Sequence, residues 1–202
     1  MDLILETVKK LETMIKDSGC DDVGIVLDVN ADAKNCQFER GACMTATFGG
    51  RSADFITYDP VRAKTKISFM FGTPLDNPRV RGAATAIVNV STGFFCLSRV
   101  LHSCPESSHT ECRRQLLSEL GNKKIFCIGT IPVVESAFRN GIVTTPRDAD
   151  VIIINGDGII EPAAGDIIRA AKETQKILCF GPSTAGIARL NQLDHWCPFG
   201  TC

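Results

Sequence analysis

Three short apolar segments in the C-terminal half are the feature that most constrains the fold. They are KKIFCIG (123–129), ADVIIING (149–156) and KILCFG (176–181). Segments with a helical pattern, 132–140 and 162–173, separate them. Strands that are apolar along their whole length are buried on both faces, which is typical of a parallel sheet covered by helices. We therefore predict a Rossmann-like unit, to which GIVTT (141–145) can add a further short strand.

The N-terminal half has a different pattern. An amphipathic helix over residues 3–15 comes first, and a long buried helix over 78–101 and a second helix over 109–120 come last. Between them lie four short β-rich segments separated by turn residues, which predict an antiparallel sheet. These segments are 24–29, 43–48, 54–59 and 66–71. We assign residues 1–120 to an α+β domain and residues 121–202 to the Rossmann-like domain, so the fold class is α/β.

Composition excludes several classes of protein. The 202 residues are 44% hydrophobic and 22% charged, as in soluble globular proteins. A formal net charge of -1 and 6% aromatic residues argue against a nucleic-acid partner. Polar residues interrupt the most apolar stretch, and acidic residues interrupt the first helix, so neither a membrane span nor a secretory signal is expected. We expect a cytoplasmic protein, and a homo-oligomer is compatible with the sequence.

Ten cysteines are many for such a chain, and in a reducing compartment they serve as apolar residues, metal ligands or nucleophiles rather than disulfides. Several crowd one connection together with two of the three histidines, and a Cys-x4-Cys pair ends the chain. The candidate metal ligands are Cys96, His102, Cys104, His109, Cys112, Cys197 and Cys202. Thiolate and imidazole bind transition metals such as zinc or iron. The spacing matches no standard metal motif, so the alternative is buried thiols and surface histidines.

The turns that follow the three apolar strands are candidates for binding a small molecule, because ligands bind at the carboxyl ends of parallel strands. Their residues are Gly129, Thr130, Asn155, Gly156, Asp157, Gly181, Pro182, Ser183 and Thr184. Amides at a helix start and the two hydroxyls of the last turn can hold a carboxylate or phosphate, or they can simply cap the helix. Asp157 could bind a ligand hydroxyl or a cation, or belong to a plain glycine turn. The glycine fingerprint of dinucleotide binding is missing, so no nicotinamide cofactor is expected.

The C-terminal half resembles the family of heavy-metal-chelation domains of unknown function. The resemblance is carried by KKIFCIGTIP, ADVIIINGDGII, KILCFGPSTAG and LDHWCPFG within residues 121–200, and by NPRVRGAATAIVNV upstream. It implies a Rossmann-like domain preceded by a small α+β domain of enolase-N-terminal type. Two strand ends depart from the family: Gly129-Thr130 stands in place of a turn bearing His, and Asn155-Gly156-Asp157 in place of Thr-Gly-Thr. These departures predict a ligand that differs from that of typical members.

Three functions stay open on the sequence. The first is binding or handling of a transition metal, or of a small anionic metal-chelating molecule, in an interdomain cleft at the strand carboxyl ends. The second is a transferase of the cofactor-biosynthesis type that acts on a small phosphorylated or carboxylated metabolite without a metal. The third is a scaffold that binds no small ligand.

Other chemistry has weaker support. A Gly-x-Ser-x-Gly elbow does not occur, and three histidines leave few bases for a hydrolase. Cys43 and Cys127 are conceivable nucleophiles, but neither has a sequence neighbour that would lower its pKa. Four arginines could contact an anion from the first domain or could be solvated surface residues. They are Arg40, Arg51, Arg79 and Arg81.

Overall fold

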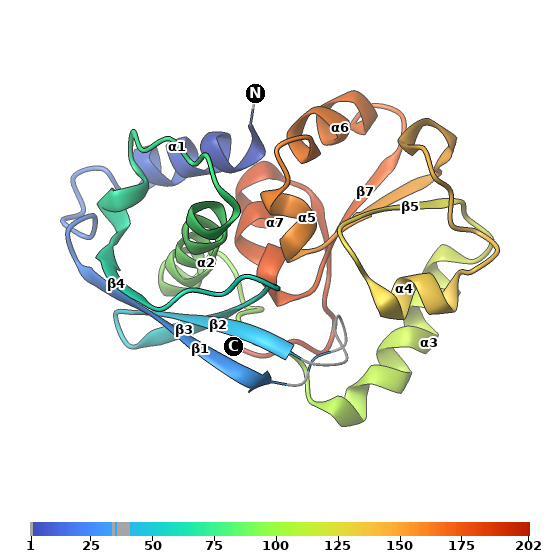
Figure 1. The fold of residues 1–202 in the computed structure, drawn as a ribbon, viewed down its shortest axis with the longest axis horizontal. Coiled ribbons are helices and arrows are strands. Elements are labelled where there is room, and N and C mark those ends of the chain that lie inside the picture. The colour runs from blue at the N-terminus through green and yellow to red at the C-terminus, as the bar shows by residue number, and fades with distance from the viewer. Residues whose placement is uncertain (1, 34, 36–40) are drawn as a thin grey trace.

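A computed structural model describes residues 2–33, 35 and 41–202; Arg40 lies outside these residues. The N-terminal half comprises α1 (Leu3–Ile15), β1 (Gly24–Ala33), β2 (Gly41–Phe48), β3 (Arg51–Ile56), β4 (Ala63–Lys66), α2 (Pro78–Phe94) and α3 (His109–Leu120). The C-terminal half comprises β5 (Ile125–Ile128), α4 (Pro132–Ala137), β6 (Val151–Ile154), α5 (Gly156–Ile160), α6 (Ala164–Ala171), β7 (Lys176–Phe180), α7 (Ala185–Asn191) and β8 (Asp194–Trp196). Figure 1 shows α1, α2 and the antiparallel sheet on one side of the molecule, and the parallel sheet with α3 and α4 on the other.

The first four strands form the predicted antiparallel sheet, in the order β3-β2-β1-β4. The fourth strand differs most from the sequence prediction. We predict a strand over 66–71, whereas β4 covers Ala63–Lys66 and a 3-10 turn follows over Ile67–Met70. Ile67 and Met70 are three residues apart and both are fully buried. A 3-10 turn aligns residues at that spacing on one side, whereas a strand would place them on opposite faces.

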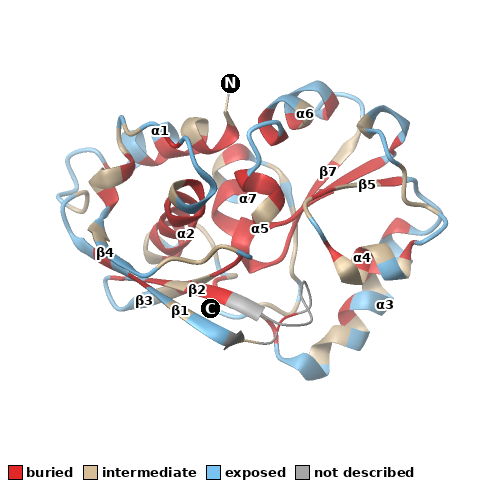
Figure 2. Ribbon diagram, viewed as in Figure 1, coloured by how far each residue is buried: buried red, intermediate tan, exposed pale blue. Residues whose placement is uncertain are grey.

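Helix α2 is enclosed by the rest of the molecule. It lies against β2 and β3, α1 and α7, and almost all of its residues are buried (Figure 2). Asn77 caps its start by accepting a hydrogen bond from the Val80 amide. The helix ends at Phe94 rather than continuing to 101. There the backbone turns at Cys96, whose φ is 58°, and the Leu97 amide donates to the carbonyl of Thr92.

The four later strands pair in parallel, in the order β5-β6-β7-β8. Ile142, in the segment where we predict a short strand, forms a single parallel bridge with Ile125. The amide and the carbonyl of Ile125 both bond to the segment around Ile142, whereas β6 bonds to the residue next to Ile125. The segment around Ile142 therefore lies along the edge of β5 opposite to β6. After β5 the chain therefore passes first along one edge of that strand, at Ile142, and then adds β6 along the opposite edge. This reversal makes the gap between β5 and β6 the topological switch point of the sheet.

The two sheets share one hydrophobic core. Buried residues of α1, α2 and the inner face of the antiparallel sheet pack with one face of the parallel sheet, and α3 and α4 cover the other face. Within residues 2–33, 35 and 41–202, none of the helices combines the length and the hydropathy that a membrane span requires.

Candidate functional site

A hollow of about 460 Å³ lies at the switch point of the parallel sheet. The turn after β5 and the start of α5 line one side, and the loop that follows β3 lines the other. The lining residues are Thr57, Tyr58, Asp59, Pro78, Gly129, Thr130, Asp157, Ile160, Glu161 and Pro162. Among the residues predicted to bind a ligand, Gly129, Thr130 and Asp157 therefore reach the same hollow. We call it the switch-point cleft.

Asp157 occupies the inner part of this cleft. Its Oδ1 accepts a hydrogen bond from the Thr57 hydroxyl at 2.7 Å, whereas its Oδ2 is enclosed and has no hydrogen-bond partner among the described residues. Burial raises the pKa of the carboxyl, the hydrogen bonds from Thr57 and the Tyr58 amide oppose the rise, and the charge of Asp59 adds to it. A buried carboxylate oxygen without a donor is costly, so this oxygen is a natural contact for a cation or a ligand donor.

The electrostatics of the cleft are acidic. Asp59, Asp157 and Glu161 line it, and none of the lining residues within the described part of the chain is a lysine or an arginine. Burial and the charge of Asp157 raise the pKa of Glu161. Burial, followed by the charges of Asp157 and Glu135, likewise raises the pKa of the Tyr58 hydroxyl. Of the arginines considered above, Arg79 donates from Nε to Asp59 Oδ1 at 2.8 Å and offsets one of the three negative charges.

The turn after β7 does not reach the cleft. Ser183 and Thr184 are fully buried, and both hydroxyls bond within the protein. The Ser183 hydroxyl accepts from the Ile56 amide at 2.7 Å, and the Thr184 hydroxyl donates to the carbonyl of Gly181 at 3.0 Å. Pro182 is also buried. The geometry therefore gives this turn a structural role, that of joining β7 to the end of β3.

A side chain of α2 also hydrogen-bonds to the same turn. Asn89 donates to the carbonyl of Ser183 at 2.7 Å and accepts from the Gly186 amide at 2.8 Å. A Cβ on Gly186 would lie 2.7 Å from the Asn89 Oδ1, so the glycine permits this close approach. The helix-start amide that a ligand anion would need is thus already paired with Asn89.

The turn after β6 begins a helix instead of forming a plain glycine turn. Asn155 is fully buried; its Oδ1 accepts from the Gly158 amide and its Nδ2 donates to the Thr130 carbonyl, each at 2.8 Å. Gly129 has a φ of 83°, and a Cβ there would lie 2.1 Å from the Asn155 Oδ1. Gly156 is packed against Ser183. Asn155 and Gly156 therefore shape the cleft from behind without lining it.

The structure brings part of the Cys/His set together. Cys104 and Cys112 are buried near Cys197, whose pKa is raised to about 12 by burial and further by these two thiols. Cys96 and Cys202 are exposed. The buried Nε2 of His109 has no hydrogen-bond partner in the part of the chain that the structure describes, and both ring nitrogens of His102 contact side chains of β3. Among the described residues, no three His, Cys, Asp or Glu side chains are arranged to hold a metal ion.

Four further candidates from the sequence, two cysteines and two arginines, lie outside the cleft lining. Burial raises the pKa of both Cys43 and Cys127 to about 12, so each is a neutral thiol near pH 7. The Arg81 side chain, only 5% exposed, pairs with Asp2 at 2.6 Å and donates to two backbone carbonyls. It joins α2 to the chain start and does not face the cleft, whereas Arg51 is exposed at the start of β3.

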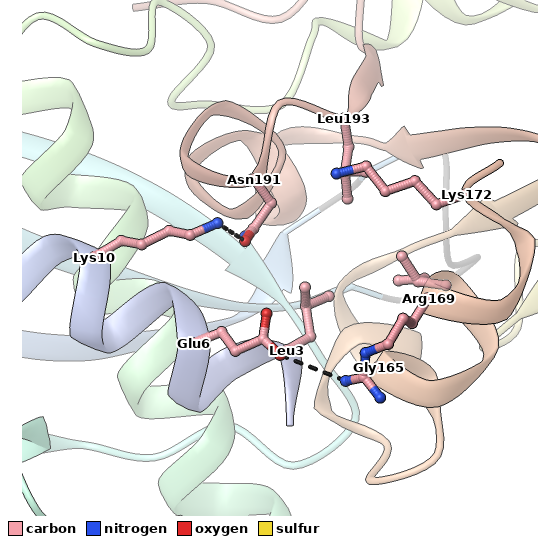
Figure 3. A pocket seen from close by; sticks show the side chains of 9 residues that line it. Leu3, Glu6, Lys10, Gly165, Arg169, Lys172, Asn191 and Leu193 are labelled. Carbon is pink, nitrogen blue, oxygen red and sulfur yellow. Dashed lines mark hydrogen bonds and ion pairs between the residues drawn. The ribbon is translucent and has the colours of Figure 1, made fainter. Parts of the chain in front are cut away.

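A second, smaller hollow of about 160 Å³ lies between α1, α6 and the end of α7 (Figure 3). Its charged side chains pair mostly with each other and with α7. Lys10 donates to Asn191 Oδ1 at 2.7 Å, and Arg169 contacts Glu6 at 3.4 Å. These contacts tie α1 to the C-terminal half, and they leave the switch-point cleft as the better candidate site.

Sequence reasoning missed the wall of the cleft formed by Thr57, Tyr58 and Asp59, and it missed Glu161. We predicted a strand through residue 59, but β3 ends at Ile56. The Tyr-Asp-Pro turn at 58–60 was the available signal for that end. Nothing local indicates that this turn faces the parallel sheet, because the contact depends on how the two sheets pack.

These features define an α/β protein with an antiparallel sheet, a Rossmann-like parallel sheet and an acidic cleft at its switch point. No family model matches the chain, and no curated protein matches its sequence. A Desulfitobacterium hafniense protein of unknown function from the DUF364 family has a similar structure, with a TM-score of 0.51 and 11% identity over 94% of this chain and 83% of that chain. A Pyrococcus horikoshii protein, also described as of unknown function and from that family, gives 0.49 and 14% over 91% and 80%. At such identity the likeness shows the fold alone.

Proposed function

We propose that the protein binds a small positively charged ligand in the switch-point cleft, either a transition-metal complex or an organic cation. The observation that carries the proposal is the enclosed Asp157 Oδ2, an acceptor without a donor in a cleft that Asp59 and Glu161 also line. A bound cation would supply the missing partner and offset both the burial and the charge repulsion that raise the pKa values of Asp157 and Glu161.

The form of the cation follows from the donor set. The cleft offers carboxylate and hydroxyl oxygens, which suit hard cations better than soft ones. Because no three described carboxylates are placed to enclose a bare ion, the ligand is expected to bring its own shell of water or organic donors. This retains the metal handling that the family resemblance implies, but the charge of the cleft disfavours a free anionic chelator.

Thermal unfolding and calorimetry test the proposal with defined probes: Mn²⁺, Ni²⁺ and Zn²⁺ with and without citrate, putrescine as an organic cation, and inorganic phosphate as an anion. A cation at 100 times its dissociation constant should stabilise the protein by about 2.7 kcal/mol. Binding should release protons, since it lowers the raised pKa values of the cleft carboxyls.

Variants locate the binding. Asp157→Asn should abolish the stabilisation, whereas the control Glu173→Gln, at an exposed carboxylate outside the cleft, should leave it unchanged. Stabilisation by phosphate alone would contradict the proposal and favour the transferase. Equal binding by Asp157→Asn and the wild type would place the ligand elsewhere, and no response to any probe would favour the scaffold.

A further inference from the structure

The outer face of the antiparallel sheet carries a serine, a histidine and an aspartate in one row. Residues alternate along β3, so Ser52 and Asp54 share a face while Ala53 and Phe55 point into the core, where both are fully buried. His102, far along the chain, lies against both. Its Nε2 is 3.3 Å from the Ser52 Oγ, and its Nδ1 is 3.2 Å from the Asp54 Oδ1.

Asp54 is held in place by several donors. Besides His102, its Oδ1 accepts a hydrogen bond from the Thr45 hydroxyl at 3.3 Å, and its Oδ2 accepts from the Ser103 amide at 3.1 Å. The side chain is 15% exposed. A carboxylate with donors on both oxygens keeps one orientation, and here that orientation points one oxygen at the histidine ring.

Backbone contacts position His102. Its amide donates to the Thr201 carbonyl at 3.0 Å, and the Thr201 amide returns the bond at 3.2 Å. Next to it, the Asp54 amide donates to the carbonyl of Leu101 at 2.7 Å. The histidine side chain nevertheless stays 29% exposed, so a small molecule can approach the ring and the serine.

These contacts determine the tautomer of the ring. An ionised carboxylate only accepts hydrogen bonds, so the Nδ1 facing Asp54 carries the hydrogen. In the neutral imidazole, Nε2 then has a lone pair directed at the Ser52 hydroxyl. This is the division of roles in a Ser-His-Asp triad, which is recognised by geometry and not by the order of its residues in the chain.

We propose that Ser52 and His102 are catalytic residues, positioned by Asp54, for acyl transfer from small carboxylic esters or thioesters. The Ser52 oxygen attacks the carbonyl carbon while its proton passes to His102 Nε2. The bond to the leaving alcohol or thiol breaks, and that group takes the proton from His102. Water then attacks the acyl-serine with His102 as base, which releases the carboxylic acid and restores the serine.

This site is separate from the switch-point cleft. Ser52 lies near the start of β3 on the outer face, whereas Thr57 enters the cleft after the end of the same strand. Neither proposal depends on the other, so a change at Ser52 should leave cation binding intact and Asp157→Asn should leave acyl transfer intact.

Reaction with a fluorophosphonate, followed by peptide mass spectrometry, tests the serine directly. We expect an adduct on Ser52 in the full chain, retained in the control Ser136→Ala, which alters an exposed serine on α4. Ser52→Ala should remove the adduct and hydrolysis of p-nitrophenyl acetate. His102→Gln should slow both by about 10²-fold or more, the usual contribution of a general base. The double variant Ser52→Ala, His102→Gln should be no slower than Ser52→Ala, because the two residues act as a unit.

The positioning role of Asp54 is tested by a measurement that a change in stability alone would not affect. Asp54→Asn should lower the labelling rate and change its pH dependence, while Asp54→Glu should restore part of the rate. Melting temperatures of all variants show whether each one is folded. The proposal is overturned if the folded wild type gives no Ser52 adduct and no hydrolysis above the Ser52→Ala background, or if folded His102→Gln reacts as fast as the wild type.

Discussion

Replacing Ser183 by alanine tests whether the turn after β7 stabilises the fold or binds a ligand. The hydroxyl is fully buried and accepts from the amide of Ile56, which is 1% exposed. Without it, that amide has no partner, and an orphaned buried donor costs about 1–3 kcal/mol. In a chain of this length each 1 kcal/mol lowers the melting temperature by about 2–4 °C. A loss of about 2 kcal/mol therefore corresponds to a decrease of roughly 4–8 °C.

The chain offers a matched control for that change. Ser91, on α2, is also fully buried, but its hydroxyl has no hydrogen-bond partner within residues 2–33, 35 and 41–202. Ser91→Ala removes the same atom and leaves no group orphaned, so its stability should equal or exceed that of the wild type. Urea denaturation followed by circular dichroism measures both free energies of unfolding. Equal losses for the two variants would refute the reasoning, as would a Ser183→Ala variant of wild-type stability.

Three further changes probe other contacts. Arg81→Ala removes a buried guanidinium that pairs with the partly exposed Asp2 and donates to two buried backbone carbonyls, so it should cost about 1–3 kcal/mol in urea denaturation; an unchanged free energy of unfolding would contradict this. Gly158→Ala, whose Cβ would lie 2.0 Å from the Ile128 carbonyl, should cost more than about 4 kcal/mol, whereas Gly24→Ala meets nothing within 4 Å and should fold normally. The raised pKa of Asp157 means that the native state binds more protons than the unfolded chain, so the wild type loses stability as pH rises through the folded pKa. Melting curves should therefore show that the stability of Asp157→Asn minus that of the wild type is larger at pH 7 than at a pH below the unfolded pKa of about 3.9. An identical stability difference at the two pH values would oppose the assignment.

The elements that depend on local pattern could be predicted. The apolar strands of the C-terminal half and their parallel pairing follow from burial on both faces, and α3 covers 109–120 as predicted. The short strand β8 escaped prediction because three residues carry too little pattern. The seven residues after α2 were assigned to the helix because they are apolar, but Leu101 packs on Gly93, which requires the chain to turn back.

The site depends on contacts that join distant residues. Asp157 was a candidate because it follows a strand, but its partner Thr57 lies 100 positions away. His102 was grouped with cysteines by proximity in sequence, whereas in the fold its ring lies over Ser52 and Asp54. Such pairings arise from strand register and sheet packing, which local sequence does not encode.

The enclosure of α2 has a consequence for synthesis on the ribosome. The helix is complete by residue 94, but α7, which covers part of it, spans Ala185–Asn191. At a synthesis rate of about 5–20 residues per second, this apolar surface stays uncovered for on the order of ten seconds before α7 has been made. The nascent chain is therefore expected to be a substrate for ribosome-associated chaperones, although the finished protein buries the same surface.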